Sequence, residues 1–207
     1  MTAKFISIEG IEGAGKSTQL AFIQQFLSES GKNVRVTREP GGTELGEQIR
    51  SLLLTPSSIP MAVDTELLLM FAARAEHIHQ LIKPLLADDV WVISDRFIDA
   101  TFAYQGGGRG ISQQRITELA DWTLQGLQPD LTFVFDLPVE IGQQRVIKRN
   151  EAIDRFEQEK VDFFEKIRAC YLQRAEAEPD RIKVIDASQS IEDIQIQLSS
   201  ILKQITE

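Results

Sequence analysis

Eight residues near the start of the chain combine glycines, a lysine and a serine in a spacing suited to phosphate. Residues 10–17 read Gly-Ile-Glu-Gly-Ala-Gly-Lys-Ser and directly follow the apolar run 5–8. The glycines let backbone N–H groups close around phosphate oxygens, Lys16 can neutralise β and γ phosphates, and the Ser17 hydroxyl can bind Mg²⁺. A plain glycine turn is the alternative. The strand before the pattern and the helix after it favour a nucleotide site.

A carboxylate and a guanidinium follow a second apolar segment. Asp95 and Arg96 come directly after residues 91–94, which read Trp-Val-Ile-Ser. If this segment is a strand, both side chains lie at the carboxyl edge of the sheet, where open α/β folds bind ligands. Asp95 can then hold Mg²⁺ through water, as a Walker B aspartate does. A surface ion pair is the alternative for Asp95 and Arg96.

Three further segments carry polar groups that could line a cleft. Proline and two glycines after Glu39 favour an extended Glu39 and a close approach of the backbone to a ligand, with an ordinary turn as the alternative. Phe71 and Arg74 share one helical face and could stack on a flat ring and pair with its edge, although Phe71 is equally suited to the core. Residues 101–105 combine polar and aromatic side chains before the glycine-rich loop expected at 106–110, and we expect this segment to form a second ligand-binding wall, with a plain flexible loop as the alternative.

Histidines and further basic residues remain to be assigned. His77 and His79 have no metal-ligand spacing, and we expect both on the helix surface. Basic residues recur between positions 145 and 156, and they could close over a polyphosphate as a lid. A solvated basic helix end is the alternative for this segment.

Composition limits the class of protein. The chain has 207 residues, 43% of them apolar, which suits one domain over residues 1–207. With 22 basic against 31 acidic residues the net charge is −9, so we expect no nucleic-acid partner. Cys170 is the single cysteine and no run is long enough to span a membrane, which favours a reducing cytoplasm.

Short runs of branched residues alternate with segments of helical period, which predicts a three-layer α/β fold around a five-stranded parallel sheet. Strands are expected at residues 5–9, 34–37, 90–94, 131–135 and 183–185. Helices are expected at residues 16–30, 44–54, 64–87, 112–127, 139–149, 157–177 and 191–205. Pro84 should kink the third helix or begin a new one.

The absence of other motifs narrows the chemistry. No Asn-Lys-x-Asp stretch reads guanine, and no serine or cysteine has a histidine and acid partner for acyl transfer. Transfer of a phosphoryl group to another phosphate needs no general base, because the acceptor oxygen is already anionic.

Together these motifs, in this order, resemble the thymidylate kinase family along nearly the whole chain. The resemblance implies phosphorylation of dTMP to dTDP by Mg-ATP, a P-loop NTPase fold with a short lid over residues 145–156, and a homodimer. It implies that the ATP phosphates are bound by Gly10, Ile11, Glu12, Gly13, Ala14, Gly15, Lys16, Ser17 and Thr18. Ser17 and Asp95 would then organise magnesium.

The resemblance also assigns the acceptor site. Glu39 would face the sugar or its magnesium, Arg50 and Arg96 the monophosphate, and Phe71 and Arg74 the thymine. The sugar pocket would be formed by Thr101, Tyr104 and Gln105, with the bulk of Tyr104 disfavouring a ribose 2′-hydroxyl. Because residues 11–14 contain no arginine, the catalytic arginine is expected from the lid, and we favour Arg149 over Arg145, Lys148 and Arg155.

Two other functions are compatible with the residues themselves. One is a kinase for another nucleoside monophosphate or for a deoxynucleoside. The other is a non-catalytic ATP-binding regulator, against which the lid cations and the Asp95-Arg96 pair argue.

Overall fold

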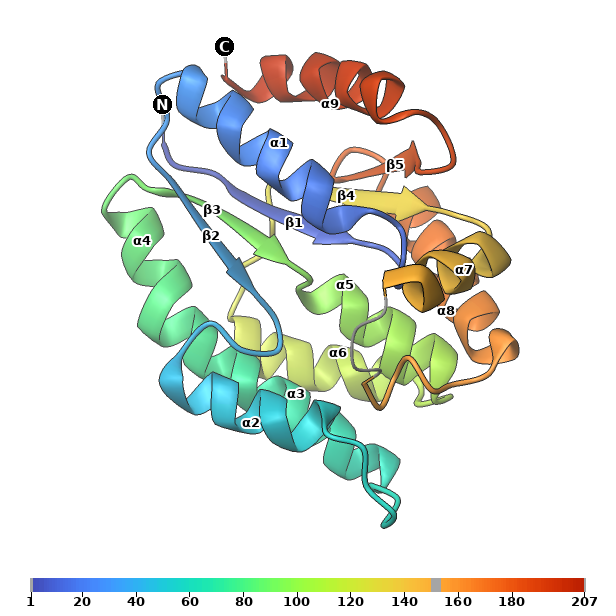
Figure 1. Cartoon of the computed structure of the whole chain (residues 1–207). Helices are drawn as coiled ribbons and strands as arrows, with labels where there is room; N and C mark the ends of the chain where they lie inside the picture. The colour runs from blue at the N-terminus through green and yellow to red at the C-terminus, as the bar shows by residue number, and fades with distance from the viewer. Residues whose placement is uncertain (1, 150–153, 207) are drawn as a thin grey trace.

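A computed structural model describes residues 2–149 and 154–206 of the chain. Its centre is a parallel five-stranded sheet in the order β2-β3-β1-β4-β5 (Figure 1). The strands are β1 (Phe5–Glu9), β2 (Val34–Arg38), β3 (Trp91–Asp95), β4 (Leu131–Asp136) and β5 (Ile182–Asp186). All five predicted strands are confirmed, with ends that differ by one residue at most.

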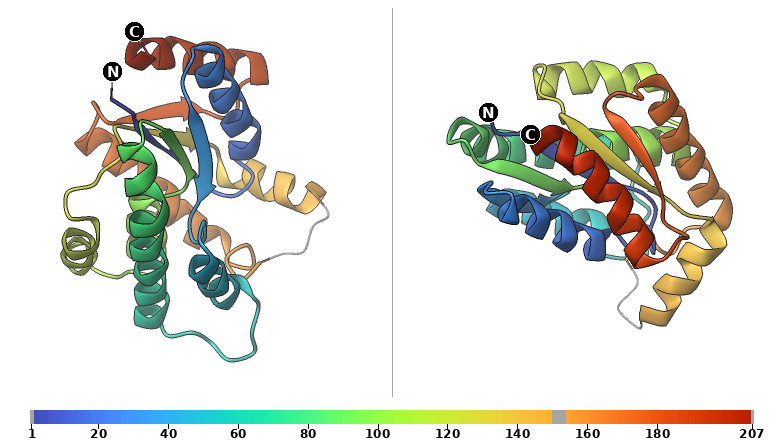
Figure 2. Two further views of the ribbon diagram at one scale, coloured as in Figure 1. Left: turned by 90° about the vertical axis from the view of Figure 1, so that its left-hand side faces the viewer. Right: turned by 90° about the horizontal axis from the view of Figure 1, so that it is seen from above.

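Helices cover both faces of the sheet, as a parallel sheet requires. They are α1 (Lys16–Glu29), α2 (Glu44–Leu54), α3 (Val63–His77), α4 (Lys83–Ala87), α5 (Ile98–Thr101), α6 (Gln113–Leu124), α7 (Val139–Arg149), α8 (Val161–Ala177) and α9 (Ile191–Thr206), with π-helical turns η1 (Ile78–Ile82) and η2 (Phe102–Gly108). The views in Figure 2 place α1 and α9 on one face, and α4, η2 and α8 on the other. Within the described residues, no helix is both long and apolar enough to cross a bilayer.

The register of the strands brings the predicted site residues to one edge. Ile8 pairs with Asp95 across β1 and β3, and Arg38 pairs with Asp95 across β2 and β3. Because parallel strands end on the same side, the segments that follow β1, β2 and β3 lie beside one another. The phosphate loop, Glu39 and Arg96 therefore converge although they lie far apart in the sequence.

The long helix predicted at 64–87 is divided into three parts. It begins as α3, passes through the π-helical turn η1 and continues as α4, whose first turn contains Pro84. A proline lacks the N–H that continues the α-helical pattern but fits the first turn of a new helix. The backbone stays helical from α3 through η1 into α4, so the predicted change at Pro84 takes the form of a π-helical turn directly before it and not of a separate helix.

The predicted glycine-rich loop is wrong for Gly106, Gly107 and Gly108. These residues belong to the π-helical turn η2, which packs against α8. A Cβ atom on Gly107 would lie 2.9 Å from the carbonyl oxygen of Lys166, and one on Gly108 would lie 2.4 Å from the Phe163 ring. These glycines allow η2 and α8 to pack closely. In the sequence, the same glycines suggest the conformational freedom of a loop.

Candidate active site

The phosphate loop connects β1 to α1 and is shaped by its glycines. Gly10 and Gly13 have φ angles of +136° and +76°, and Cβ atoms there would lie 2.6 Å from the Phe135 oxygen and 2.2 Å from the Gly142 oxygen. Only glycine fits both the backbone conformation and the close approach of β4 and α7. The Lys16 ammonium donates to the carbonyl oxygens of Gly10 and Ile11 at 3.0 and 2.9 Å. Burial and the nearby Arg96 charge lower the pKa of Lys16 to about 8.

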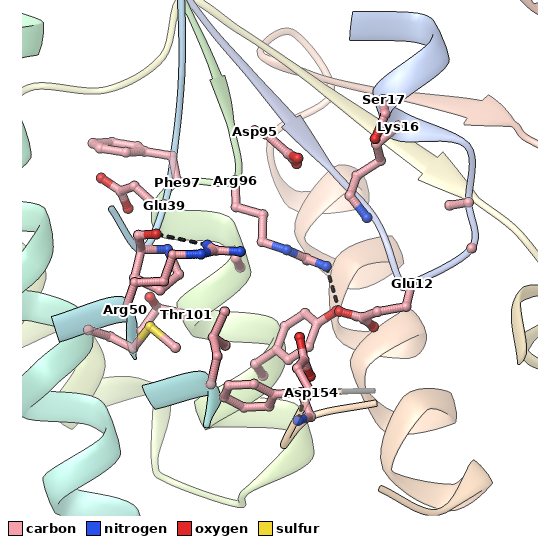
Figure 3. Close-up of a pocket in the computed structure, with 18 of the residues that line it drawn as sticks. Glu12, Lys16, Ser17, Glu39, Arg50, Asp95, Arg96, Phe97, Thr101 and Asp154 are labelled. Atoms are coloured by element: carbon pink, nitrogen blue, oxygen red, sulfur yellow. Dashed lines mark hydrogen bonds and ion pairs between the residues drawn. The ribbon is translucent and has the colours of Figure 1, made fainter. Parts of the chain in front are cut away.

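A cavity of about 480 Å³ opens beside this loop and contains most of the predicted site residues (Figure 3). The predicted residues on its wall are Glu12, Gly13, Ala14, Gly15, Lys16, Ser17, Thr18, Glu39, Arg50, Arg74, Asp95, Arg96, Thr101, Tyr104 and Gln105. The structure thus gathers residues from the first half of the chain that the sequence left as separate motifs.

Asp95 and Ser17 provide the oxygens suited to magnesium. The Oδ1 atom of Asp95 is buried and has no hydrogen-bond partner among the described residues, and both side chains line the cavity. No group of three or more acidic, histidine or cysteine side chains able to cage a metal occurs within residues 2–149 and 154–206. Mg²⁺ at nucleotide sites takes few protein oxygens and completes its shell with phosphates and water, so this pair fits the ion.

Arg96 crosses the cavity from the end of β3 toward the phosphate loop (Figure 3). Its guanidinium donates to the Gly10 oxygen at 3.0 Å and to the Glu12 carboxylate at 2.7 Å. Its backbone has a φ of +72°, and its N–H donates to the Ile8 oxygen at 2.9 Å. A residue other than glycine is strained in this conformation and keeps it only where its surroundings hold it, and such residues cluster at functional sites.

Tyr104 and Glu12 complete the contacts of this guanidinium. The Arg96 guanidinium lies 4.7 Å from the centre of the Tyr104 ring, and the Tyr104 hydroxyl donates to both Glu12 oxygens at 2.7 and 2.8 Å. Burial raises the pKa of Tyr104 well above its usual value, which keeps the hydroxyl protonated as a donor. The sequence predicts that Glu12 belongs to the phosphate loop. Because Glu12 occupies a variable position of the motif, the motif does not predict its contacts with Arg96 and Tyr104.

Arg74 lies on α3 and is buried at 2% exposure. Its Nε donates to Glu39 at 2.7 Å and its Nη2 to the Phe97 oxygen at 2.9 Å, while its buried Nη1 has no partner among the described residues. Phe71 is also buried, and the centre of its ring lies 5.2 Å from the Arg74 guanidinium. It is not part of the cavity wall, to which Phe97 contributes a phenyl ring. Stacking of Phe71 on a base therefore stays a prediction.

His77 corrects an expectation. The sequence predicts it on the helix surface, yet the structure buries it completely between α3 and β2, while His79 is exposed as expected. The ring nitrogens of His77 lie 2.9 Å from Glu39 and 2.7 Å from Thr37. Its partners, Thr37 in β2 and Glu39 just after β2, are distant in sequence. The helical period of α3 alone therefore does not predict that His77 is buried.

The basic residues of the predicted lid have different surroundings. Arg145, on α7, donates to the Gly13 oxygen at 3.3 Å, and Lys148 is exposed. Arg149 ends α7, and the placement of its side chain lies outside what the structure describes. Arg155 donates to Leu53 and Glu66, both at 2.6 Å, which anchors it to α2 and α3.

Glu66 is a second residue that sequence reasoning missed. It is 1% exposed on α3 and accepts hydrogen bonds from Gln105, Arg109 and Arg155. It therefore connects Arg155, near the end of the predicted lid, to the wall formed by η2. Next to Arg155, Phe156 lines the cavity and packs edge-on against Tyr104 at 5.7 Å between ring centres.

Glu9 is the last residue of β1 and is completely buried. It accepts hydrogen bonds from the Phe97 N–H and the Tyr171 hydroxyl, both at 2.8 Å. Burial, together with the Asp99 charge, raises its pKa to about 7. Glu9 thus holds the backbone of Phe97, the residue that follows Arg96.

Comparison with known proteins places these features in a family. The sequence profile of the family described as thymidylate kinase matches residues 8–198. The thymidylate kinase of Pseudomonas savastanoi is 54% identical over 207 residues, covering 100% of this chain and 98% of that protein. That of Alcanivorax borkumensis is 52% identical over 205 residues, covering 99% and 98%.

A solved structure agrees with this result. The crystal structure of thymidylate kinase from Ehrlichia chaffeensis superposes with a TM-score of 0.78 at 35% sequence identity. The match covers 98% of this chain and 99% of that one, so the similarity extends over the sheet and its helices alike.

Proposed function

The chain belongs to the thymidylate kinase family, and we propose that its cavity binds the phosphates of ATP and of dTMP on either side of Arg96. The protein phosphorylates dTMP to dTDP with ATP and magnesium, as a nucleoside monophosphate kinase. Because such a transfer requires little covalent chemistry of the protein, its residues act by positioning and by balancing charge.

The donor side is the phosphate loop, residues 10–18. Its backbone N–H groups and the N-terminus of α1 would bind the ATP phosphates, and Lys16 would supply the positive charge. Ser17 and Asp95 would hold magnesium, which neutralises charge on the β and γ phosphates when it is bound. The unpartnered Oδ1 atom of Asp95 supports this role.

The acceptor side is formed by arginines and by the wall of α5 and η2. Arg50 and Arg96 would bind the monophosphate, and Arg74 would pair with the thymine edge through its free Nη1. Thr101, Tyr104 and Gln105 would surround the sugar, since all three are buried and line the cavity. The bulk of the Tyr104 ring would disfavour a ribose 2′-hydroxyl.

The lid is proposed over residues 145–156 of a single domain. Arg149 stays our proposal for the arginine that stabilises charge on the transferred group. Arg155 is bound to Glu66 and to α2, which supports a role as the fixed end of the lid. The lid would then close about this anchor and shed water from the phosphates.

The assembly is proposed to be a cytoplasmic homodimer without a nucleic-acid partner. Leu45, Leu52 and Leu68 are 49%, 63% and 56% exposed on the paired helices α2 and α3, which offers an apolar surface for a second copy. The net charge of −9 argues against nucleic acid. Light scattering would measure the assembly directly, and a mass of one chain would overturn the dimer.

The observation that carries this proposal is Arg96, which contacts the phosphate loop from the acceptor wall. The test is an assay of ADP release with Mg-ATP and matched concentrations of dTMP, dUMP, UMP, CMP, AMP and GMP. We expect a strong preference for dTMP. Preference for another monophosphate would overturn the base and sugar assignments.

A further inference from the structure

We propose that His77 is a positioning residue for Arg74 and acts on it through Glu39. The inference rests on the proposed function of Arg74 as the group that pairs with thymine. It assigns Glu39 to the support of an arginine as well as to the cavity wall, and it gives a role to a histidine that touches no substrate.

Four side chains form one buried series of hydrogen bonds. Thr37 Oγ1 lies 2.7 Å from His77 Nε2, His77 Nδ1 lies 2.9 Å from Glu39 Oε1, and Arg74 Nε lies 2.7 Å from Glu39 Oε2. The side chains of Arg74, Glu39 and His77 are only 2%, 4% and 0% exposed. Water therefore competes little with these bonds, and each partner depends on the next.

The chemistry of the groups fixes the direction of the bonds. A carboxylate only accepts, so the Nδ1 atom of His77 must carry the hydrogen in its contact with Glu39. In the neutral imidazole the Nε2 atom then accepts from the Thr37 hydroxyl. Both the imidazole and the guanidinium thus donate to Glu39, and each holds a different oxygen.

This arrangement sets the direction of the remaining Arg74 donor. A guanidinium is planar, and with Nε bound to Glu39 and Nη2 bound to Phe97 its orientation is fixed. Its Nη1 atom is buried without a partner among the described residues, and Arg74 lines the cavity. A buried N–H without an acceptor is costly, so a base that offers a carbonyl oxygen there is favoured over one that does not.

The backbone beside the series is adapted to it. Gly42 has a φ of +81°, and a Cβ atom there would lie 2.6 Å from Thr37 Oγ1 and 2.7 Å from His77 Nε2. The sequence predicts that the glycines after Glu39 allow a ligand to approach the backbone. At Gly42 the groups that approach the backbone are His77 and Thr37. The lack of a Cβ atom there leaves room for the hydrogen bonds that hold Arg74.

The test compares His77→Leu with His77→Asn. Leucine removes both bonds, whereas the asparagine amide can take the place of Nδ1 and donate to Glu39. We expect His77→Leu to raise the KM for dTMP about tenfold, with the KM for ATP unchanged within about twofold. His77→Asn should restore the KM for dTMP to within about threefold of the unchanged protein.

Two controls separate positioning from loss of structure. Ser7→Ala removes an equally buried hydroxyl contact, 2.7 Å from Thr132 on β4, and should leave both KM values unchanged. Competition by 2-deoxyribose 5-phosphate, which has no base, should be the same for His77→Leu and the unchanged protein. Equal weakening of ATP, dTMP and the sugar phosphate in His77→Leu would overturn the proposal.

The remaining outcomes distinguish this inference from the proposed function. If Arg74→Ala leaves the affinity for dTMP unchanged in calorimetry, the thymine role of Arg74 is wrong. If Arg74→Ala weakens dTMP but both His77 variants keep a normal KM, only the role of His77 is overturned. Should His77→Leu fail to fold, Thr37→Val replaces it, and an increase of about threefold in the KM for dTMP supports the proposal while no change overturns it.

Discussion

The donor and acceptor sides of the cavity are held in place by different means. On the donor side, the residues proposed to bind the ATP phosphates, 10–18, are contiguous, and the conformation of their backbone is set by glycines with positive φ angles. On the acceptor side, the groups are side chains from separate elements, and its arginines are held by partners from other elements. Arg74 is held by Glu39, and Arg96 by Glu12.

This difference determines how each side responds to substitution. We expect the donor side to depend on side-chain identity mainly at Lys16, because under the proposed function backbone N–H groups make most of the other phosphate contacts. The acceptor side depends on buried pairs, and removing one member leaves its partner buried without compensation. Substitutions on the donor side should therefore act mainly on turnover, and those on the acceptor side mainly on selectivity and affinity for dTMP. Arg96 contacts the loop from the acceptor wall, so its substitution should affect both.

The largest effect is expected for Lys16→Ala. It removes the charge proposed to face the donor phosphates, while Lys16 itself contacts the carbonyl oxygens of Gly10 and Ile11 in the loop. We expect kcat to fall roughly a thousandfold, the upper range for the loss of one preorganised donor, with the affinity for dTMP kept. Steady-state kinetics and calorimetry measure the two quantities, and Lys203→Ala on the exposed face of α9 is the control. A loss of less than tenfold would contradict this division of the cavity.

An intermediate effect is expected from Glu9, which is buried at the end of β1. Burial and then Asp99 raise its pKa from 4.5 to about 7. The folded state binds this proton more tightly than the unfolded state, so the stabilisation is complete below about pH 4.5 and is lost as pH rises through about 7. The loss is on the order of 3 kcal/mol and should be absent from Glu9→Gln.

Denaturant unfolding at several pH values between 4.5 and 8 checks this prediction. The difference in free energy of unfolding between Glu9→Gln and the unchanged protein should grow in favour of the variant as pH rises. Glu29→Gln, at an exposed position of α1, should show no such trend. Parallel curves for the unchanged protein and Glu9→Gln would show that the buried carboxyl does not titrate in this range.

The smallest effect is expected from the sugar wall. Tyr104→Ala removes the ring that packs against Arg96 and Phe156 and should reduce the preference for dTMP over ribo-TMP about tenfold. Tyr104→Phe keeps the ring and loses only the contact with Glu12, so its preference should stay near that of the unchanged protein. Ratios of kcat/KM for the two substrates give the answer, and an unaltered ratio in Tyr104→Ala would exclude discrimination by bulk.

The same contrast explains what the sequence could predict. The phosphate loop was predictable because its chemistry resides in one contiguous pattern, and helices such as α2 and α7 match their predicted bounds because their apolar period is regular. The parallel sheet followed from the alternation of apolar runs and helical segments.

The supporting side chains could not be predicted in this way. His77 and Glu39 lie 38 positions apart, and Glu66 and Arg155 lie 89 apart, so only the folded chain pairs them. Likewise, a glycine in the sequence does not show whether it is needed for a loop conformation or for close packing. At Gly107 it is needed for close packing against α8. Buried polar pairs between elements leave no periodic signal in either partner's own segment.

The most direct test of the account is calorimetry and turnover with Arg96→Ala, because Arg96 is the group that joins the two sides. We predict an ATP affinity within about twofold of the unchanged protein, a dTMP affinity at least about tenfold weaker, and kcat reduced about a hundredfold or more. Arg115→Ala, at an exposed ion pair on α6, should change none of these values. Full turnover and unchanged dTMP affinity in Arg96→Ala would contradict the assignment of the acceptor site.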